Sequence, residues 1–337
     1  MKAMVLEKPG PIESSPLVLR EVPDPAPGPG QVLVRIELCG VCRTDLHIVE
    51  GELPPHKQPV IPGHEVVGRV MDLGPGCSRL KVGDWVGVAW LHQTDGTCRY
   101  CRRDQENLCD SPLFTGYDVD GGYAEFTLAQ EDFAYPLPSE LSSATLAPLL
   151  CAGIIGYRAL RRSEVKPGQR LGLYGFGASA HIVIQIALHW GCEVYVASRD
   201  VKHQALATEM GATWVGAGSD RPPVKLDSAI LFAPVGDLVP PMLEALDRGG
   251  TLAIAGIYLT GIPALDYERH LFQERTLRSV TANTREDGRE LLRLAAQIPL
   301  RAHTQSFALG EANESLRRLK HDEISGAAVL QIAPASG

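Results

Sequence analysis

Four side chains that can bind a metal ion lie close together between residues 95 and 109. Asp95, Cys98, Cys101 and Cys109 follow one another in the order D-x2-C-x2-C-x7-C. Cysteines spaced in this way on a tight loop bring their sulfur atoms to a single tetrahedral ion such as zinc, and an aspartate can supply a fourth, harder oxygen ligand. The surrounding stretch is rich in turns and charges, so a structural metal ion would stabilise it in place of a hydrophobic core.

The same cysteines admit two simpler interpretations. They could be three unrelated thiols, or Cys98 and Cys101 could form a C-x-x-C redox pair. A redox pair does not usually carry a further cysteine at the distance of Cys109, and this favours the metal site.

Three further candidate ligands are far apart in the chain. Cys42 lies in CGVCRTDLH (Cys39–His47), His64 in PGHE (Pro62–Glu65) and Cys151 in PLLCAG (Pro148–Gly153). A catalytic zinc site holds three protein ligands and leaves one position for water or substrate, and two cysteines with one histidine would form such a set. Taken singly, however, a cysteine is more often a small buried residue. Spacing alone does not join these three residues.

Several motifs, taken in order, resemble the zinc-dependent medium-chain alcohol dehydrogenase family of the medium-chain dehydrogenase/reductase superfamily. They are CGVCRTDLH, GHE, VGDWV (Val82–Val86), the cysteine segment, DGGYAEF (Asp120–Phe126) and a glycine motif described below. The resemblance covers nearly the whole chain. It implies an α/β protein with a GroES-like β-rich catalytic domain and a Rossmann doubly wound parallel-sheet cofactor domain, assembled as a homodimer or homotetramer.

The resemblance implies two zinc sites. Cys42, His64 and Cys151 would bind a catalytic zinc ion. Glu65 would lie beside them in the metal site, and Asp45 would orient one of the ligands. The cysteine segment would bind a structural zinc ion, although most relatives have a cysteine at the position of Asp95.

The resemblance also implies roles for three residues of the CGVCRTDLH motif. Thr44 and His47 match the hydroxyl and imidazole groups that carry the alcohol proton to solvent, and Arg43 matches a residue that meets the cofactor pyrophosphate. An imidazole suits this role because it exchanges protons near neutral pH.

Composition predicts a soluble enzyme of two domains. The chain has 337 residues, of which 45% are apolar and 21% charged, and it exceeds the size of a single core. A net charge of −8 without a basic block argues against nucleic-acid and membrane partners and leaves a small molecule as the partner. We expect no signal peptide and no stretch that approaches a membrane span. Because both metal sites need reduced thiols, we expect a cytoplasmic location.

The pattern of residues changes near Pro148. Before it, we expect strands in a turn-rich region, at Val32–Leu38, His64–Gly74 and Asp84–Trp90. After it, strands and helices alternate as in a parallel sheet. The expected strands are Leu171–Gly177, Glu193–Asp200, Ser228–Pro234, Thr251–Ile257 and Gly326–Ala333, and the expected helices are Ala180–Gly191, Gln204–Met210, Pro240–Leu246, Arg289–Gln297 and Glu311–Lys320. The predicted domains are 1–150, with the zinc segment at about 92–112, then 151–285, and 286–337 returning to the catalytic domain.

A dinucleotide-binding motif stands at the first strand–helix turn of the second domain. Residues 175–180 read GFGASA and fit the pattern G-x-G-x-x-G/A. Gly175 permits the tight turn, Gly177 lets the backbone approach the pyrophosphate, and Ala180 allows the helix to pack on the strand. The helix that follows offers unpaired N–H groups to the phosphates. A glycine pattern alone could be a plain tight turn, but its place between an apolar strand and a helix favours nucleotide binding.

The end of the next strand bears on the choice between NAD and NADP. An acid about 20 residues past the glycine motif would bind the ribose 2′-hydroxyl of NAD. Ser198 stands there instead, followed by Arg199, and a guanidinium suits the 2′-phosphate of NADP. The sequence therefore favours NADP over NAD. In the other interpretation, Asp200 takes the acid's role or Arg199 stacks on adenine.

These features predict a zinc-dependent alcohol dehydrogenase or aldehyde reductase. Aliphatic residues at Val49 and Leu53, with Trp90 and Ile155, would line a wide apolar pocket for medium aliphatic or aromatic primary alcohols, unless they only fill the core. The alternatives are a zinc-free quinone or enoyl reductase of the same superfold, which would lack Cys42, His64 and the cysteine segment, and a non-enzymatic zinc- or cofactor-binding protein.

Overall fold

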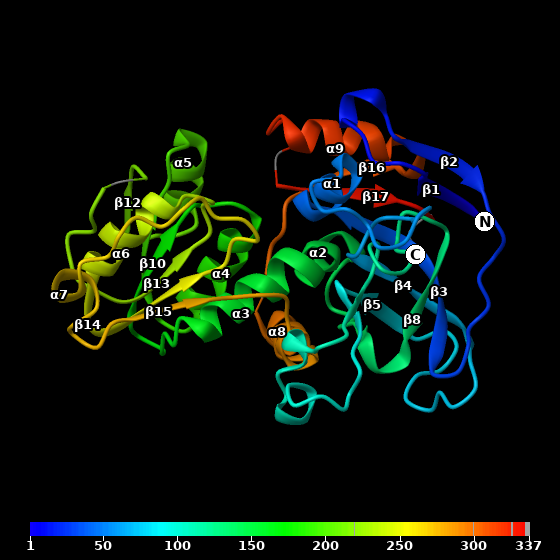
Figure 1. Cartoon of the computed structure of the whole chain (residues 1–337), viewed down its shortest axis with the longest axis horizontal. Coiled ribbons are helices and arrows are strands. Elements are labelled where there is room, and N and C mark those ends of the chain that lie inside the picture. The colour runs from blue at the N-terminus through cyan, green and yellow to red at the C-terminus, as the bar shows by residue number, and fades with distance from the viewer. Residues whose placement is uncertain (219, 299, 325, 334–337) are drawn as a thin grey trace. The chain divides into compact units, whose positions relative to one another are not determined.

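The chain folds into two compact units in a computed structural model that describes residues 1–218, 220–298, 300–324 and 326–333 (Figure 1). One unit comprises Met1–Cys151 and Ala282–Gly337, and the other Ala152–Thr281. The chain thus returns to the first unit at Ala282, slightly before the predicted boundary at residue 286. Cys151 also belongs to the first unit rather than opening the second.

The first unit is built on a seven-stranded sheet. Its strand order is β16-β17-β3-β4-β5-β9, and β8 also pairs with β3. The long strand β3 (Gln31–Val41) pairs antiparallel with β4, β8 and β17, so that strands from both ends of the chain meet on it. The other strands of this sheet are β4 (Val66–Leu73), β5 (Trp85–Val88), β8 (Phe126–Gln130), β9 (Ala134–Pro136), β16 (Thr304–Ala308) and β17 (Ala327–Gln331).

Smaller elements surround this sheet. Two hairpins lie outside it: β1 (Lys2–Leu6) with β2 (Leu17–Glu21), and β6 (Leu91–Gln93) with β7 (Leu113–Phe114). The α-helices are α1 (Arg43–Glu50), α2 (Ser143–Pro148), α8 (Arg285–Gln297) and α9 (Ala312–Lys320), and the short 3-10 turns are Ile12–Ser14, Cys101–Arg103, Glu106–Leu108, Glu131–Phe133 and Leu309–Glu311.

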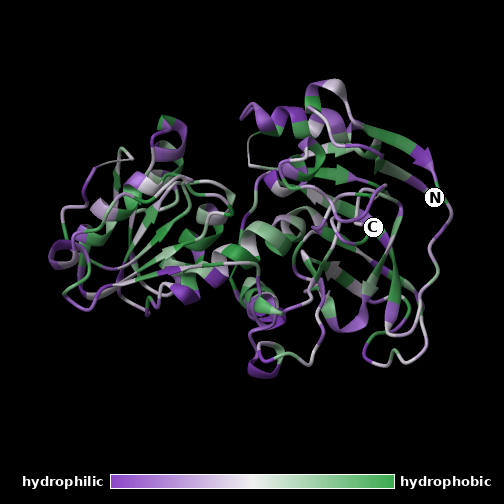
Figure 2. Cartoon of the chain, viewed as in Figure 1, coloured by the Kyte–Doolittle hydropathy of each residue, from purple (hydrophilic) through white to green (hydrophobic). Residues whose placement is uncertain are grey.

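Apolar side chains of β3 show how the core of the first unit forms. Val32, Val34 and Ile36 alternate along the strand and are fully buried, as the half-buried strand predicted there requires. Central strands are coloured mainly as hydrophobic in Figure 2, and hydrophilic colour gathers on outer helices and loops. This core fixes the end of β3 and the start of β4, next to which Cys42, His64 and Glu65 lie.

The second unit is a six-stranded, all-parallel sheet of order β12-β11-β10-β13-β14-β15. In chain order this is 3-2-1-4-5-6, the doubly wound arrangement of a Rossmann domain, and the predicted fold class is confirmed. Its strands are β10 (Arg170–Tyr174), β11 (Glu193–Ala197), β12 (Trp214–Gly216), β13 (Leu226–Leu231), β14 (Leu246–Ile254) and β15 (Thr276–Ser279). Its helices are α3 (Ile154–Arg162), α4 (Ala178–His189), α5 (Val201–Glu209), α6 (Val239–Ala245) and α7 (Tyr267–His270), with a 3-10 turn at Gly236–Leu238.

The stretch Ser143–Arg162 is helical where no helix was predicted. Helix α2, a π turn at Leu149–Gly153 and α3 follow one another without a break. By length and composition alone this run could span a membrane, which corrects the expectation that no stretch approaches such a span. Most of the run is buried inside the protein, and this burial accounts for its apolar composition.

Candidate functional site

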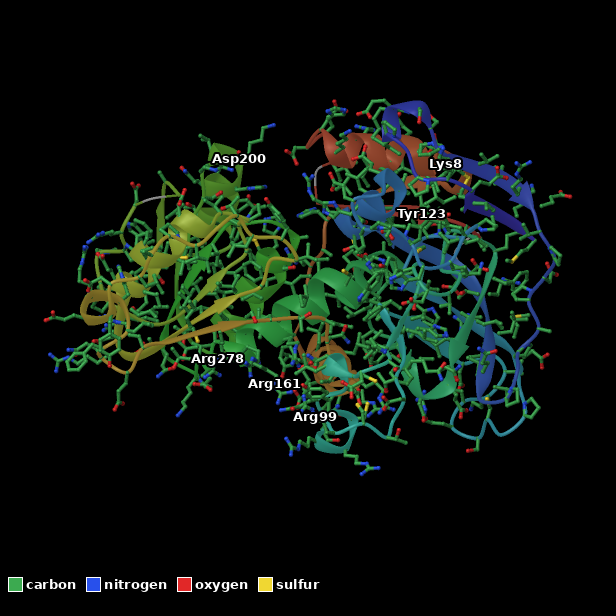
Figure 3. The ribbon with its side chains drawn as sticks, viewed as in Figure 1. Lys8, Arg99, Tyr123, Arg161, Asp200 and Arg278 are labelled. Carbon is green, nitrogen blue, oxygen red and sulfur yellow. The ribbon has the colours of Figure 1, made fainter. Side chains whose placement is uncertain are left out.

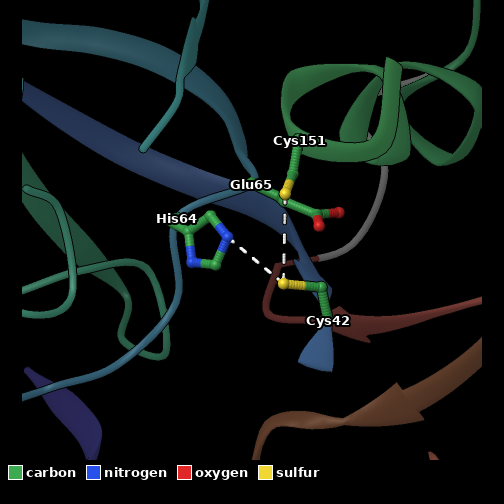
Figure 4. A group of neighbouring side chains, drawn as sticks. All are labelled: Cys42, His64, Glu65 and Cys151. Atoms are coloured by element: carbon green, nitrogen blue, oxygen red, sulfur yellow. Dashed lines mark hydrogen bonds between the residues drawn. The ribbon is translucent and has the colours of Figure 1, made fainter. Parts of the chain in front are cut away.

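Four predicted metal-site residues meet in the first unit. The ligand atoms of Cys42, His64, Glu65 and Cys151 all lie within 4.8 Å of one another. The Cys42 sulfur lies 3.3 Å from His64 Nε2 and 4.0 Å from Cys151 Sγ, and dashed lines in Figure 4 join it to both. The structure thus brings together three residues that their spacing in the sequence could not join.

Cys42 is held at the start of α1 by a capping box. Its sulfur accepts a hydrogen bond from the N–H of Thr44 at 3.3 Å, and its own N–H donates to Asp45 Oδ2 at 2.9 Å. The sharp change from β3 to α1 therefore fixes the cysteine before any ion binds.

His64 and Glu65 lie in the turn before β4, not in the strand predicted from residue 64. Asp45 Oδ1 lies 3.0 Å from His64 Nδ1, so Nε2 faces the Cys42 sulfur. Glu65 fits only because residue 40 is glycine, since a Cβ at Gly40 would collide with the Glu65 carboxylate. Gly40 is thus a site residue that sequence analysis did not single out.

Cys151 projects from the π turn that follows Pro148. A π turn widens the helix by one residue and occurs often at functional sites. The widened turn lies opposite the end of β3 and turns the Cys151 sulfur toward Cys42 (Figure 4).

Burial and mutual contacts shift the acidity of this cluster. The hydrogen bond from Cys151 and the nearby His64 hold the pKa of the Cys42 thiol well below its usual value, whereas its contact with Cys42 raises the pKa of Cys151. Burial opposes a charge on His64, but Asp45 and the Cys42 sulfur outweigh it and raise its pKa. Burial raises the pKa of Glu65. The lowered pKa of Cys42 favours its thiolate, the form of cysteine that binds a metal cation.

The donor set fits zinc. Tetrahedral zinc, with bonds of about 2.3 Å to sulfur and about 2.0–2.1 Å to nitrogen, places neighbouring donors about 3.6–3.8 Å apart. The Cys42–His64 and Cys42–Cys151 separations of 3.3 and 4.0 Å lie on either side of this range. Two sulfurs and one imidazole are also the ligand types that zinc prefers over magnesium or calcium.

The second predicted cluster also forms. The ligand atoms of Asp95, Cys98, Cys101 and Cys109 lie within 4.8 Å of one another. Backbone N–H groups point at two of the sulfurs: Cys109 Sγ accepts from Asp95 and Ser111, and Cys98 Sγ accepts from Cys101. Such N–H···S bonds stabilise thiolates, the form of cysteine that binds a metal.

Asp95 also stabilises the turn of this segment through backbone hydrogen bonds. Its Oδ1 accepts hydrogen bonds from the backbone N–H groups of Cys98, at 2.8 Å, and Thr97, at 2.7 Å. These bonds lower the pKa of the Asp95 carboxyl far below its usual value, so the group is ionised at neutral pH. Burial acts in the opposite direction on Cys101 and raises the pKa of its thiol to about 12.

The three predicted proton and cofactor residues lie along α1. Thr44 and His47 are three residues apart, hence on the same side of the helix. His47 Nδ1 is hydrogen-bonded to the carboxylate of Glu52. Arg43 is half-exposed, and its guanidinium pairs with the carboxylate of Asp322.

In the second unit, the glycine motif forms the turn expected of it. Gly175 has φ of +89°, and a Cβ there would meet the backbone of Ala233. Helix α4 begins at Ala178, two residues earlier than predicted, with Gly177 as its cap. A Cβ on Gly177 would meet no atom within 4 Å, so the helix start is open to a ligand, while Ala180 is fully buried.

The three candidate residues for cofactor choice lie in different environments at the end of β11. The Asp200 side chain caps α5, accepting from Lys202 N at 2.7 Å, and is labelled at the start of that helix in Figure 3. Ser198 is buried, with its backbone bonded to Gly216 and Gln204, whereas Arg199 is exposed. Because Asp200 is engaged as a cap, Ser198 and Arg199 remain the residues at the position that an acid would hold.

A row of rings next to the metal cluster was only partly foreseen. Trp90, expected in the pocket wall, lies with its ring centre 5.0 Å from that of His64. Phe114, Tyr117 and His56 continue the row and were not singled out. Phe114 and Tyr117 lie in and just after β7, whereas His56 lies in a distant loop, and no local pattern in the sequence marks them. Val49, by contrast, is fully buried in the core.

Comparison with known proteins agrees with this geometry. Residues 28–139 match the family model described as alcohol dehydrogenase GroES-like domain, and residues 180–297 match zinc-binding dehydrogenase. "Probable alcohol dehydrogenase AdhA" of Mycobacterium tuberculosis (strain CDC 1551 / Oshkosh) is 54% identical over 337 residues, covering 98% of this chain and 97% of the relative.

Two solved structures extend the similarity to the whole fold. A cobalt- and zinc-bound thermostable alcohol dehydrogenase from Pyrobaculum aerophilum aligns with a TM-score of 0.87 at 27% identity, covering 99% of each chain. A zinc-binding dehydrogenase from Sinorhizobium meliloti 1021 bound to NADP aligns with a TM-score of 0.84 at 26% identity, also over 99% of each chain. Another structure with the same TM-score is a complex with NAD.

Proposed function

Because this chain belongs to the zinc-dependent alcohol dehydrogenase family, we propose that it interconverts primary alcohols and aldehydes with two zinc ions per chain and NADP as its preferred cofactor. The observation that carries this proposal is the convergence of Cys42, His64, Glu65 and Cys151 in one cluster, in which His64 and Glu65 are buried and the two cysteines are partly buried. This cluster sets the protein apart from zinc-free reductases of the same fold.

The protein's own groups prepare the reaction. When bound, zinc supplies a Lewis acid that polarises the substrate oxygen, and the nicotinamide exchanges hydride with the substrate carbon. Cys42, His64 and Cys151 would hold the zinc, with Glu65 beside them. Asp45 keeps His64 turned so that Nε2 points into the cluster.

Thr44 and His47 provide a path for the alcohol proton. The Thr44 hydroxyl follows the metal-site residue Cys42 by two positions, and His47 lies one turn further along the same helix. The His47 side chain is 30% exposed and bonded to Glu52, so its imidazole can pass a proton to solvent. Arg43, on the same helix, would meet the cofactor's phosphates in place of Asp322, with which its guanidinium is now paired.

Metal content tests the assignment of the catalytic site. We expect Cys42→Ala to lose one of two zinc ions and to reduce turnover of benzyl alcohol to background, because the remaining donors no longer enclose an ion. Zinc should be counted by mass spectrometry together with circular dichroism, and Cys192→Ala, at a buried cysteine outside both clusters, is the matched control. A Cys42→Ala protein with two zinc ions and full activity would rule the site out.

Ser198 and Arg199 support the preference for NADP. A guanidinium beside a dianionic phosphate makes charge-assisted hydrogen bonds about twice as strong as neutral ones. We expect a lower KM for NADP(H) than for NAD(H), and we expect Ser198→Asp to invert this order because the carboxylate repels the phosphate and accepts from the ribose hydroxyls.

Both Michaelis constants, measured for both proteins, decide the preference. If the unaltered enzyme already has the lower KM for NAD(H), Ser198 and Arg199 do not select the phosphate. Asp220→Asn, in the loop after β12, is the control for a general change of charge in this unit.

We also place the enzyme, as a homodimer or homotetramer, in the cytoplasm, where its free thiols would stay reduced. Its substrates would be medium aliphatic or aromatic alcohols, since Trp90 and Leu53 pack at the edge of the core as partly buried apolar groups. Light scattering and a panel of alcohols and aldehydes test these points.

A further inference from the structure

A continuous row of aromatic rings runs outward from the metal cluster. The Trp90 ring meets His64 edge-on, with ring centres 5.0 Å apart, and stacks on Phe114 at 4.9 Å and 15°. Tyr117 follows at 5.8 Å from Trp90, and His56 packs on Tyr117 at 4.5 Å. Trp90 and Phe114 are only partly buried, so an aromatic molecule whose oxygen reaches the metal cluster can lie along them.

The outer end of this row is polar. Tyr117 OH lies 3.1 Å from His56 Nε2, and His56 Nδ1 lies 2.7 Å from Asp118 Oδ1. The Asp118 side chain is only 9% exposed and also accepts from the N–H of Phe114 through Oδ2, at 2.8 Å. A buried carboxylate therefore anchors a histidine, and the histidine in turn anchors a tyrosine hydroxyl.

The direction of these hydrogen bonds follows from the carboxylate. Asp118, when ionised, can only accept, so in the neutral imidazole of His56 the proton is on Nδ1 and Nε2 has the lone pair. Tyr117 must then donate its O–H to His56, and its oxygen keeps the capacity to accept from another donor. The end of the row thus offers an acceptor, and the charge of Asp118 disfavours an anionic group there.

We propose that Tyr117, oriented by His56 and Asp118, selects aromatic alcohols and aldehydes that carry a hydroxyl group on the ring end remote from the reacting carbon. This inference rests on the proposed function and names the substrate class of the same site. The ring of such a substrate packs on Trp90 and Phe114, and its phenol O–H donates to the Tyr117 oxygen.

Two pairs of substrates isolate the remote hydroxyl. Benzaldehyde is compared with 4-hydroxybenzaldehyde, and cinnamaldehyde with 4-hydroxycinnamaldehyde, so that a short and a long spacing are both sampled. The unaltered enzyme should favour the hydroxylated member of at least one pair in kcat/KM. Tyr117→Phe should reduce that preference about 3- to 10-fold, the range of one net hydrogen bond, through KM rather than kcat.

Variants of His56 separate recognition from folding. His56→Ala should reduce the preference in the same direction, because the Tyr117 hydroxyl loses its anchor. His56→Gln should restore it, because an amide can donate to Asp118 and accept from Tyr117. Tyr267→Phe, at an exposed tyrosine of the other unit, is the matched control.

The same comparison can be made without turnover. Calorimetric titration with benzyl alcohol and 4-hydroxybenzyl alcohol measures the preference as a ratio of dissociation constants. Two results would overturn the inference: equal affinity and equal kcat/KM within both substrate pairs, or a preference that Tyr117→Phe leaves unchanged. Either result would leave alcohol dehydrogenase activity itself intact. If none of the aldehydes is reduced, the proposed function fails, and the titration alone then decides whether Tyr117 recognises the hydroxyl.

Discussion

At the scale of single residues, one carboxylate organises the metal cluster. The two oxygens of Asp45 reach the N–H of Cys42, the N–H of Gly63 and the Nδ1 of His64, at 2.9, 3.2 and 3.0 Å. Asp45 is fully buried, and burial raises its pKa, although the charge of His64 acts in the opposite direction. A group placed between two candidate ligands in this way sets their orientation before the ion arrives.

We therefore expect Asp45→Asn to weaken zinc binding at the catalytic site about 10- to 100-fold, the usual effect of losing a partner of a ligand histidine. Competition with a chromogenic chelator gives the affinity, and the zinc of the cysteine segment serves as an internal reference. Asp72→Asn, at an exposed aspartate of β4, controls for the change in charge. Equal zinc affinity in the Asp45→Asn protein and the unaltered protein would contradict this role.

The two metal clusters differ in how far the sequence can predict them, for a physical reason. Asp95, Cys98, Cys101 and Cys109 lie on one local loop, so their spacing alone indicates an ion. Cys42, His64 and Cys151 meet only after β3, β4 and the π turn have packed, and no spacing rule contains that information. The sequence does not mark the group of His56, Tyr117 and Asp118 for the same reason, since these residues are hydrogen-bonded across two loops.

At the scale of elements, regular patterns were predicted and interrupted ones were missed. The alternating residues of β3 and the apolar runs of β10 and β13 indicated strands, because their side chains repeat at the period of the element. The helical run through α2 and α3 was missed because Pro148 stands inside it and the π turn breaks its period.

The cysteine segment is an element that depends on few apolar contacts. A partly buried ion pair joins it to the start of α8: Glu106 accepts from the backbone N–H, Nε and Nη2 of Arg285 at 2.7–2.9 Å. Burial raises the pKa of Glu106, but Arg285 outweighs it and lowers the pKa below the usual value. The stabilisation from this pair is therefore complete above the pKa of an unfolded glutamate and is lost as pH falls through the lower, folded value.

Substitutions of Asp95 test whether it is the fourth ligand of this segment. We expect Asp95→Ala to release zinc from the segment more readily and to lower Tm, whereas Asp95→Cys should hold or raise both zinc affinity and Tm. Asp95→Asn is the matched variant, since it keeps the oxygen that accepts from Thr97 and Cys98 but removes the charge. Zinc counts and calorimetric melting should be measured together.

The three Asp95 proteins separate ligation from turn formation. If the loss in Asp95→Ala is fully rescued by Asp95→Asn, the hydrogen bonds of the turn account for it and the charged ligand does not. A segment that contains no zinc after purification with ample zinc would refute the structural site itself.

At the scale of the whole molecule, the chain enters the first unit twice and the second unit once. The second unit is one continuous segment, and its core cluster of Tyr174, Leu231, Met242, Leu252 and their neighbours comes entirely from that segment. The first unit needs its C-terminal part, because β17 pairs with β3 from Val41↔Ala328 to Leu38↔Gln331. All eight candidate metal-site residues nevertheless lie between Cys42 and Cys151, in the N-terminal part.

This arrangement predicts different behaviour for fragments of the chain. A protein of residues 152–281 should fold alone and melt cooperatively, because its parallel sheet and core are complete. A protein of residues 1–151 should not fold, because it exposes the edge of β3. It also loses the two hydrogen bonds between Asn313 and the Leu17 backbone and those that Lys320 donates to Glu13 and Glu50. Circular dichroism melts and amide NMR spectra measure both outcomes.

Restoring the missing segment completes the test. Residues 1–151 joined to 282–337 through a flexible Gly/Ser linker should recover a cooperative melt and bind two zinc ions per chain without the second unit, since every candidate ligand and both parts of the seven-stranded sheet are then present. This protein should have no dehydrogenase activity, because the glycine motif at residues 175–180 is absent. A fragment 1–151 that melts cooperatively and holds two zinc ions alone would show that β17 and α9 only cover a unit that is already stable.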